Sequence, residues 1–275
     1  MQRIFHTPEG VRDIYSQECS RKQKLQEKLH RVFHQYGFED IETPTFEYFE
    51  VFSKEVGTIP SRELYKFFDR EGNTLVLRPD FTPSVSRACA TYFNPEKEVV
   101  SLCYTGNTFI NNSSFRGRLK ETTQMGVERM GDDSPEADAE ILAMTVECLL
   151  ATGLTEFQVS VGQVDYYKAI FAQTGLSQEE EEELRELISQ KNYFGVEELV
   201  KNKNMDKSLA RVLSQLPQMF GSTEVLEKAK SLTDNPQALK AVARLEEIYE
   251  LLKVYGYEKY VTFDFAMLSK YHYYT

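Results

Sequence analysis

Two long stretches with the character of strands, residues 99–109 and 119–130, lie on either side of a polar loop and most restrict what this chain can fold into. The loop, residues 110–118, carries Arg116 and Arg118, which we interpret as solvated cations at one end of a sheet. Helical patterns lie before and after this pair of strands. The expected fold class is therefore α+β, with a mixed, mostly antiparallel sheet flanked by helices.

The rest of the first 175 residues alternates between helix and strand signals. Leu25, Leu29 and Val32 belong to an apolar stripe at helical spacing, and Gly37 is typical of the position after a helix. Pro44 interrupts the next extended segment, which is expected at a sheet edge or an interface because proline cannot donate to a sheet ladder. The remaining patterns predict a hairpin over residues 64–78, helices over 81–92 and 135–152, and strands over 156–164 and 260–268.

The chain changes character between the last two of these strands. Over residues 177–254 nearly every periodic stretch is helical, and Gly221 and the pair Asn235-Pro236 act as breaks between them. We therefore expect a helical insertion, residues 176–254, placed within a core that residues 1–175 and 255–275 form.

Composition limits the class of protein. A chain of 275 residues with 18 Phe and 16 Tyr has too much apolar surface to stay disordered. There is no apolar run of membrane-spanning length and no signal-peptide pattern, so we expect a cytoplasmic protein that does not enter a membrane. A net charge of −11 argues against a dedicated nucleic-acid-binding protein, which normally has a basic face.

The four cysteines, Cys19, Cys89, Cys103 and Cys148, lie far apart and show no metal-ligand spacing with histidine. We interpret them as reduced thiols that are buried or half-buried. The sequence therefore predicts neither a metal site nor a cofactor.

Several polar residues gather around the predicted strands. Gln124 and Glu128 stand four positions apart in one strand, so both side chains point to the same face of the sheet. Burying an unpaired carboxylate is costly, so Glu128 pairs with a neighbouring arginine, lies at the sheet rim or has a functional role, and the residues alone leave these readings open. Arg78 is expected to pair with a carboxylate, and Asp80 to cap the helix that follows it.

Four segments match, in order, the motifs of one family: GFEDIETPTFEYFEVF, TLVLRPDFTPSVSR, YTGNTFINNSSFRGRLKETTQMGVERMG and LSKYHYYT. They resemble motif 1, the LRPE-x-T segment, motif 2 and the V-R-G-L-D-Y-Y segment of histidyl-tRNA synthetases. The similarity runs from about His6 to Thr275. It implies the class II aminoacyl-tRNA synthetase fold, with the helical block at the place of that family's insertion domain.

The same resemblance implies that nucleotide activation is lost. The motif 2 arginine that grips the α-phosphate of ATP falls at Ile110 and its glutamate partner at Asn112, while the catalytic arginine of the fourth segment falls at Ser269. Preorganised cations usually make the largest catalytic contribution to such transfers, and none of these three residues is a cation. Motif 3 and the last strands of the family's core would follow Thr275. We expect no catalytic residue in this chain.

An amino-acid pocket is nevertheless implied. The positions that form it in the synthetases map to Asp80, Thr82, Gln124, Glu128, Tyr273 and Tyr274, and Arg78 is expected to shape it. The carboxylates of Asp80 and Glu128 would hold an ammonium and an imidazole by charge-assisted hydrogen bonds. The expected ligand is L-histidine.

This pattern of kept binding residues and lost catalytic residues resembles that of the regulatory subunits of ATP phosphoribosyltransferase, which are inactive paralogues of histidyl-tRNA synthetase. This resemblance implies a non-catalytic chain that assembles with the short-form catalytic subunit of that glycosyltransferase, enables the first step of histidine biosynthesis and confers histidine feedback. Motif 1 implies a homodimer through residues 25–49. Two alternatives stay open: a divergent or truncated histidyl-tRNA synthetase, and a tRNA- or amino-acid-binding paralogue with another regulatory role.

Overall fold

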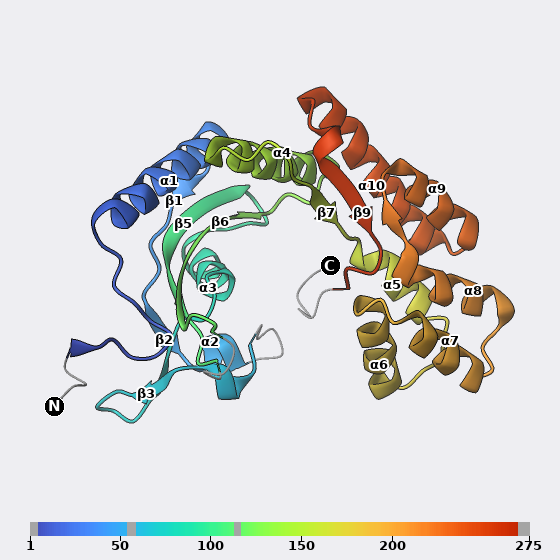
Figure 1. Ribbon diagram of the computed structural model, residues 1–275, viewed down its shortest axis with the longest axis horizontal. Coiled ribbons are helices and arrows are strands. Elements are labelled where there is room, and N and C mark those ends of the chain that lie inside the picture. The colour runs from blue at the N-terminus through green and yellow to red at the C-terminus, as the bar shows by residue number, and fades with distance from the viewer. Residues whose placement is uncertain (1–4, 54–58, 113–116, 269–275) are drawn as a thin grey trace. The chain divides into compact units, whose positions relative to one another are not determined.

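A computed structural model describes residues 5–53, 59–112 and 117–268 (Figure 1). The chain divides into two compact units, one of residues 1–133 and 147–153 and the other of residues 134–146 and 154–275. Four residues of interest from the sequence lie outside the described residues: Arg116, Ser269, Tyr273 and Tyr274.

The first unit is organised around the three-stranded sheet β1-β5-β6. β5 (Val100–Phe109) and β6 (Glu121–Met130) pair antiparallel along their whole length, and β1 (Glu39–Asp40) pairs parallel with β5. The two long strands that the sequence predicts are thus confirmed, and the sheet is mixed as expected.

The helix α1 (Ser16–Gln35) ends in a turn that brings the chain straight into β1. Gly37 has a φ of 77°, the left-handed conformation that glycine adopts at little cost. The N–H of Phe38 donates to the carbonyl of Phe33 at 3.2 Å, and the N–H of Gly37 donates to that of His34 at 3.1 Å. This Schellman motif confirms the predicted helix end and fixes β1 beside the last turns of α1.

One face of the sheet is covered by α3 (Thr82–Tyr92), which lies on the inner side of β5 and β6 (Figure 1). Phe81, Val85 and Cys89 pack against Val100, Leu102 and Tyr104 of β5 in one buried cluster. Full burial of each large apolar side chain contributes about 1.5–3 kcal/mol, so this contact holds α3 firmly on the sheet.

A second sheet of the first unit has the order β2-β4-β3. β3 (Lys66–Phe68) and β4 (Thr74–Leu77) form the predicted antiparallel hairpin, and β2 (Phe46–Tyr48) pairs with the other edge of β4. The short helix α2 (Glu50–Ser53) follows β2. Pro44 lies between β1 and β2, both of which are edge strands of the described sheets, as its place in the sequence predicts.

Among its described residues, the second unit contains the sheet β7-β9-β8 and six α-helices that lie wholly within it. β7 (Val159–Val161) runs parallel to β9 (Val261–Asp264), and β8 (Phe220–Gly221) runs antiparallel to it. The helices are α5 (Val164–Phe171), α6 (Gln178–Ser189), α7 (Tyr193–Asn202), α8 (Lys207–Gln215), α9 (Thr223–Leu232) and α10 (Pro236–Tyr255). The preceding helix, α4 (Pro135–Thr152), contributes residues to both units.

Local signals explain where the helices of residues 177–254 begin. Ser177 and Glu180 form a reciprocal capping box at the start of α6, and the Asn235 side chain accepts two backbone N–H groups at the start of α10. The helical character predicted here is confirmed apart from β8, whose two residues are too few for a strand period. The expected division into a core, residues 1–175 and 255–275, and an insertion, residues 176–254, stays a prediction.

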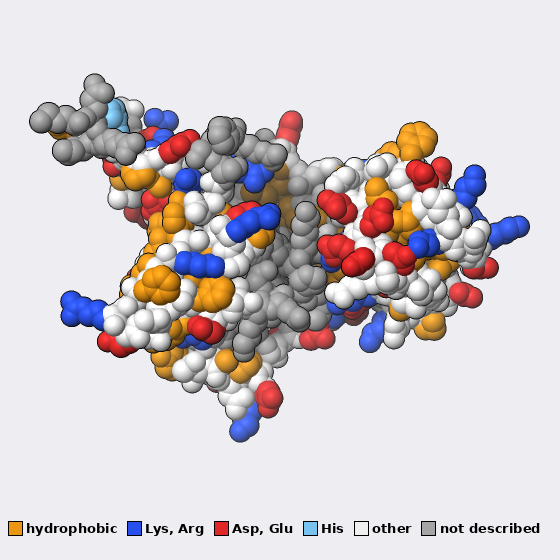
Figure 2. All heavy atoms as spheres, turned by 90° about the horizontal axis from the view of Figure 1, so that it is seen from below, with side chains coloured by type: hydrophobic (Ala, Val, Ile, Leu, Met, Phe, Trp, Pro, Cys, Tyr) orange, Lys and Arg blue, Asp and Glu red, His pale blue; other side chains and the backbone are white. Residues whose placement is uncertain are grey.

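Both units expose large hydrophobic side chains, and the second unit also has acidic side chains close together at its surface (Figure 2). Figure 2 shows acidic side chains gathered on one face of the second unit, where α6 carries Glu179, Glu180 and Glu181 in its first turn. The first unit exposes several large hydrophobic side chains, and Phe46, Tyr48 and Phe68 are more than half exposed. Among the residues that the structure describes, no helix is both long and apolar enough to cross a membrane.

Candidate functional site

The register of β5 and β6 assembles one wall of the candidate site. Three pairs of register partners lie on the face that α3 covers: Leu102 with Glu128, Tyr104 with Gly126, and Gly106 with Gln124. Because alternate residues of a strand share a face, Gln124 and Glu128 lie on the same side of the sheet, as their spacing predicts.

Glu128 is the centre of a half-buried hydrogen-bond cluster. The hydroxyl of Thr82 donates to Oε1 of Glu128 at 2.7 Å, and the hydroxyl of Tyr104 donates to the same oxygen at 3.4 Å. Burial raises the pKa of Glu128 above its ordinary value; the Thr82 hydrogen bond opposes this shift, and the nearby Asp80 carboxylate adds to it. Among the described residues no lysine or arginine forms an ion pair with Glu128. The cluster therefore has an excess of negative charge.

Asp80 is directed toward the same cluster. Its Oδ1 accepts the N–H of Phe81 at 2.7 Å and the side-chain amide of Gln124 at 3.4 Å. The expectation that Asp80 caps the following helix is wrong, because the N-cap position of α3 is Phe81 and α3 begins without a side-chain cap. Asp80 stands one residue too early to reach the free N–H groups of the first turn. The fold thus brings Asp80, Thr82, Gln124 and Glu128 together.

Three planar groups, the rings of Tyr104 and Phe81 and the guanidinium of Arg78, are stacked beside the Glu128 cluster. The rings of Phe81 and Tyr104 are parallel within 7°, with centroids 4.3 Å apart. The guanidinium carbon of Arg78 lies 4.0 Å from the centroid of Phe81. Burial raises the pKa of the Tyr104 hydroxyl, and the charges of Glu128 and Asp80 raise it further, so this hydroxyl keeps its proton and donates a hydrogen bond to Glu128.

Two glycines make room for the stack. A Cβ atom on Gly106 would lie 2.5 Å from Nη2 of Arg78 and 2.7 Å from Cζ of Phe81. A Cβ atom on Gly126 would collide with the Tyr104 hydroxyl. Gly106 of β5 and Gly126 of β6 are therefore needed because any larger residue would collide with the stacked side chains.

Arg78 is only 7% exposed and binds backbone rather than a carboxylate. Its Nη1 donates to the carbonyl oxygens of Thr43 at 2.8 Å and Pro44 at 3.2 Å, and its Nε donates to that of Asn107 at 2.9 Å. The expected carboxylate pairing is wrong, because Glu47 pairs with Arg87 instead. Glu47 affects Arg78 through its charge alone, which partly offsets the lowering of the Arg78 pKa by burial. Arg78 thus ties the segment before β2 to β5.

Ile110 and Asn112 lie just beyond the end of β5. The N–H of Ile110 donates to the carbonyl of Lys120 at 2.9 Å, and the Asn112 side chain donates to the carbonyl of Leu119 at 3.0 Å. These bonds close the described base of the hairpin connection. The Asn112 amide is thereby engaged, and the isoleucine side chain offers no charge to a phosphate.

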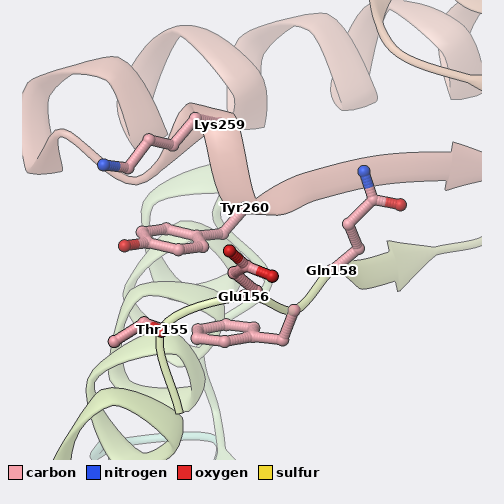
Figure 3. A pocket seen from close by; sticks show the side chains of 6 residues that line it. Thr155, Glu156, Gln158, Lys259 and Tyr260 are labelled. Carbon is pink, nitrogen blue, oxygen red and sulfur yellow. The ribbon is translucent and has the colours of Figure 1, made fainter.

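A shallow depression of about 500 Å³ lies elsewhere, in the second unit. Figure 3 shows that Lys259 and Tyr260 enter it from the segment before β9, and that Thr155, Glu156 and Gln158 enter it from the segment before β7. The rings of Phe157 and Tyr260 stack across it with centroids 4.7 Å apart. None of its lining residues is a predicted site residue.

Sequence reasoning missed Tyr104 as a member of the site. The signal was present, since Tyr104 begins the segment that matches motif 2 and, as the structure shows, lies opposite Gly126 between the positions that face Gln124 and Glu128. Its contact with Glu128 follows only from the register of β5 and β6, and this register cannot be read from the sequence alone. The predicted roles of Tyr273 and Tyr274 stay predictions.

Comparison with known proteins gives one consistent family. The family model described as histidyl-tRNA synthetase matches residues 10–275. The ATP phosphoribosyltransferase regulatory subunit of Acetivibrio thermocellus is 40% identical over 98% of this chain, and that of Thermoanaerobacter pseudethanolicus is 38% identical over 99%. The chain spans 65% and 70% of the lengths of these two relatives.

Solved structures agree with the sequence comparison. A crystal structure described as an ATP phosphoribosyltransferase regulatory subunit/histidyl-tRNA synthetase from Bacillus halodurans superposes with a TM-score of 0.89 at 32% identity, over 99% of this chain and 71% of that one. A histidyl-tRNA synthetase from a Nostoc species shares the fold, with a TM-score of 0.80 at 21% identity over 98% of this chain and 63% of that one. The class II synthetase-like fold expected from the sequence is confirmed.

Proposed function

The chain belongs to the ATP phosphoribosyltransferase regulatory subunits, a family with the histidyl-tRNA synthetase fold, and we propose that it acts as the synthetase-like part of such a subunit without catalysing a reaction itself. In this role it assembles with the short-form catalytic subunit of ATP phosphoribosyltransferase and enables the first step of histidine biosynthesis. A cytoplasmic location fits this role.

One observation carries the proposal: the acidic cluster around Glu128 is intact, while neither of the two neighbouring positions that the synthetase resemblance assigns to ATP, Ile110 and Asn112, carries a cation. Thr82 and Tyr104 both donate to Glu128, whereas Ile110 and Asn112 occupy the positions that the synthetase resemblance assigns to ATP. Removing one preorganised donor typically costs about 10²–10³ in catalytic rate. This combination favours a binding site over a site of adenylation.

We propose L-histidine as the ligand of this cluster. Its α-ammonium or imidazolium group supplies the cation that Glu128 does not find among the described residues, and Asp80 in the same cluster accepts a second charged hydrogen bond. Tyr273 and Tyr274 complete the pocket, as the sequence predicts. Feedback then follows as a coupling free energy, in which histidine binds the inhibited state of the complex more tightly than the active one.

The proposal extends to organisation and assembly. Residues 176–254 form an insertion within a synthetase-like core of residues 1–175 and 255–275. Two copies of the chain associate through residues 25–49, in which Phe46 is 51% and Tyr48 56% exposed on an edge strand. Exposed aromatic side chains on a strand edge are costly to leave in water, and a second copy covers them.

A divergent histidyl-tRNA synthetase is the second candidate, favoured by the family model that matches residues 10–275. The two candidates differ in whether histidine drives exchange of pyrophosphate with ATP. Exchange above the rate without histidine supports the synthetase, and histidine binding without exchange supports the regulatory subunit.

Complex formation tests the proposal. A fluorescently labelled short-form catalytic subunit is sedimented alone, with this chain, and with the chain plus L-histidine. We expect a faster-sedimenting species in which both proteins are present. An unchanged sedimentation rate of the catalytic subunit, with this chain added up to tens of micromolar, would contradict the proposed assembly.

A further inference from the structure

A second cluster of side chains lies on the other face of the β1-β5-β6 sheet, where the sequence predicts no metal ligands. It consists of His30 and His34 from α1, Asp40 from β1 and Cys103 from β5. One ligand atom from each residue lies within 4.8 Å of those of the other three. None of the four takes part in the candidate site around Glu128.

Asp40 joins the other three side chains. Nε2 of His30 is 2.5 Å from Oδ1 of Asp40, and Nε2 of His34 is 2.9 Å from Oδ2. The thiol of Cys103 donates to Oδ1 at 3.5 Å. The atoms that can bind a metal therefore already point toward a common centre.

The backbone explains why these residues meet. His30 and His34 are four residues apart on α1, so their rings share one face, with centroids 4.1 Å apart. The Schellman motif at Gly37 turns the chain back beside that face. Asp40 and Cys103 are register partners in the parallel pair β1 and β5, so their side chains leave the sheet on the same side.

Burial and charge suit a cation. Cys103 is fully buried, whereas 39% of the His30 side chain and 47% of the His34 side chain are exposed, so the cluster opens to solvent on one side. Two neutral imidazoles, one carboxylate and one thiolate carry two negative charges in total, which a divalent ion neutralises.

We propose that His30, His34, Asp40 and Cys103 bind a zinc ion. Nitrogen and sulfur donors select zinc or a similar transition metal, while calcium and magnesium take oxygen ligands. Bonds of about 2.0 Å to nitrogen and 2.3 Å to sulfur place neighbouring ligand atoms of a tetrahedral site about 3.3–3.6 Å apart. The ligand atoms of the present cluster lie within 4.8 Å of one another, which is comparable with that spacing. The ion then clamps the end of α1 to β1 and β5.

Metal binding by the untagged, chelator-treated chain tests the site. Equilibrium dialysis against micromolar zinc is expected to give one ion per chain. With cobalt in place of zinc, we expect the visible bands of a tetrahedral ion and a near-ultraviolet thiolate-to-cobalt band. His34→Ala is expected to weaken binding at least about tenfold. Cys103→Ser is expected to abolish the thiolate band.

Matched variants show whether an effect is specific. Cys148→Ser and His6→Ala remove the same residue types outside the cluster and are expected to bind as the unsubstituted chain does. X-ray absorption of the unsubstituted zinc-loaded chain, which does not depend on variants that fold, is expected to show one sulfur neighbour. Less than one ion bound at micromolar zinc, a zinc ion without a sulfur neighbour, or unchanged binding by folded His34→Ala and Cys103→Ser overturns the proposal.

Discussion

Cys103 and Tyr104 are consecutive residues of β5, and their side chains serve two separate polar clusters on opposite faces of one sheet. The Cys103 thiol lies 3.5 Å from Asp40, and the Tyr104 hydroxyl lies 3.4 Å from Glu128. Strand alternation separates the two clusters although the same strand carries both. Because the clusters share no side chain, a substitution in one is expected to leave ligand binding at the other unchanged.

Replacing Glu128 by glutamine should change how stability depends on pH. Burial raises the pKa of Glu128 above its ordinary value of 4.5, so the folded chain favours the protonated form. The stabilisation from this group is complete below the unfolded-state pKa and is lost as the pH rises through the raised pKa. Relative to the unsubstituted chain, Glu128→Gln should therefore gain stability as the pH rises above the ordinary pKa of the carboxyl group, 4.5.

Urea unfolding at a series of pH values measures this difference. Glu136→Gln, an exposed position on α4, is the control and should not change the pH dependence. A Glu128→Gln chain whose stability relative to the unsubstituted chain falls as the pH rises would show that the carboxylate is favoured by folding, contrary to the geometry described above.

The same substitution should weaken histidine binding. A hydrogen bond to a charged group contributes about 1.5–3 kcal/mol, which corresponds to a loss of roughly 10- to 150-fold in affinity for Glu128→Gln. Isothermal titration with L-histidine measures the dissociation constant, with Glu136→Gln again as the control. Equal affinities of Glu128→Gln and the unsubstituted chain would place the histidine site elsewhere.

Introducing a methyl group at Gly106 should disturb the stack that supports the site. The added Cβ would lie 2.5 Å from the Arg78 guanidinium and 2.7 Å from the Phe81 ring, and both groups are packed. Overpacking of this kind costs about 1–3 kcal/mol, so Gly106→Ala should lower the free energy of unfolding by that amount. Thr105→Ala changes the neighbouring exposed residue and should have a smaller effect. Equal effects of the two substitutions in chemical denaturation would argue against a tightly packed stack.

The secondary structure was largely predictable because its patterns are local. The strands expected over residues 99–109 and 119–130, on either side of a polar loop, match β5 and β6 closely. The two-residue strand β8 was not predictable, since it exists only through its pairing with β9. Asp80 was wrongly expected to cap α3, because the helix begins one residue later than the sequence pattern indicates.

The candidate site was predictable only in part. The common face of Gln124 and Glu128 follows from their spacing in one strand, which needs no knowledge of the fold. The carbonyl partners of Arg78 and the meeting of His34 with Cys103 depend on segments far apart in the chain. Such contacts arise from strand register and helix packing, and single-sequence patterns do not encode them directly.

Disrupting the exposed edge of β2 should dissociate the proposed homodimer. Phe46→Asp places a charge within residues 25–49, where it would be desolvated at the interface without a partner. Light scattering at micromolar concentration should give a dimer for the unsubstituted chain and a monomer for this variant. Tyr92→Asp changes a residue that is 76% exposed outside this segment and should remain dimeric. A monomeric unsubstituted chain would contradict the proposed assembly.

The central claim concerns another protein's activity, and the turnover of a short-form ATP phosphoribosyltransferase catalytic subunit tests it most directly. Its rate is measured with increasing amounts of this chain, first without and then with L-histidine. We predict that the rate rises to a plateau as the chain is added and that histidine lowers this plateau. A rate that stays the same at every chain concentration, with or without histidine, would contradict the assignment as a regulatory subunit.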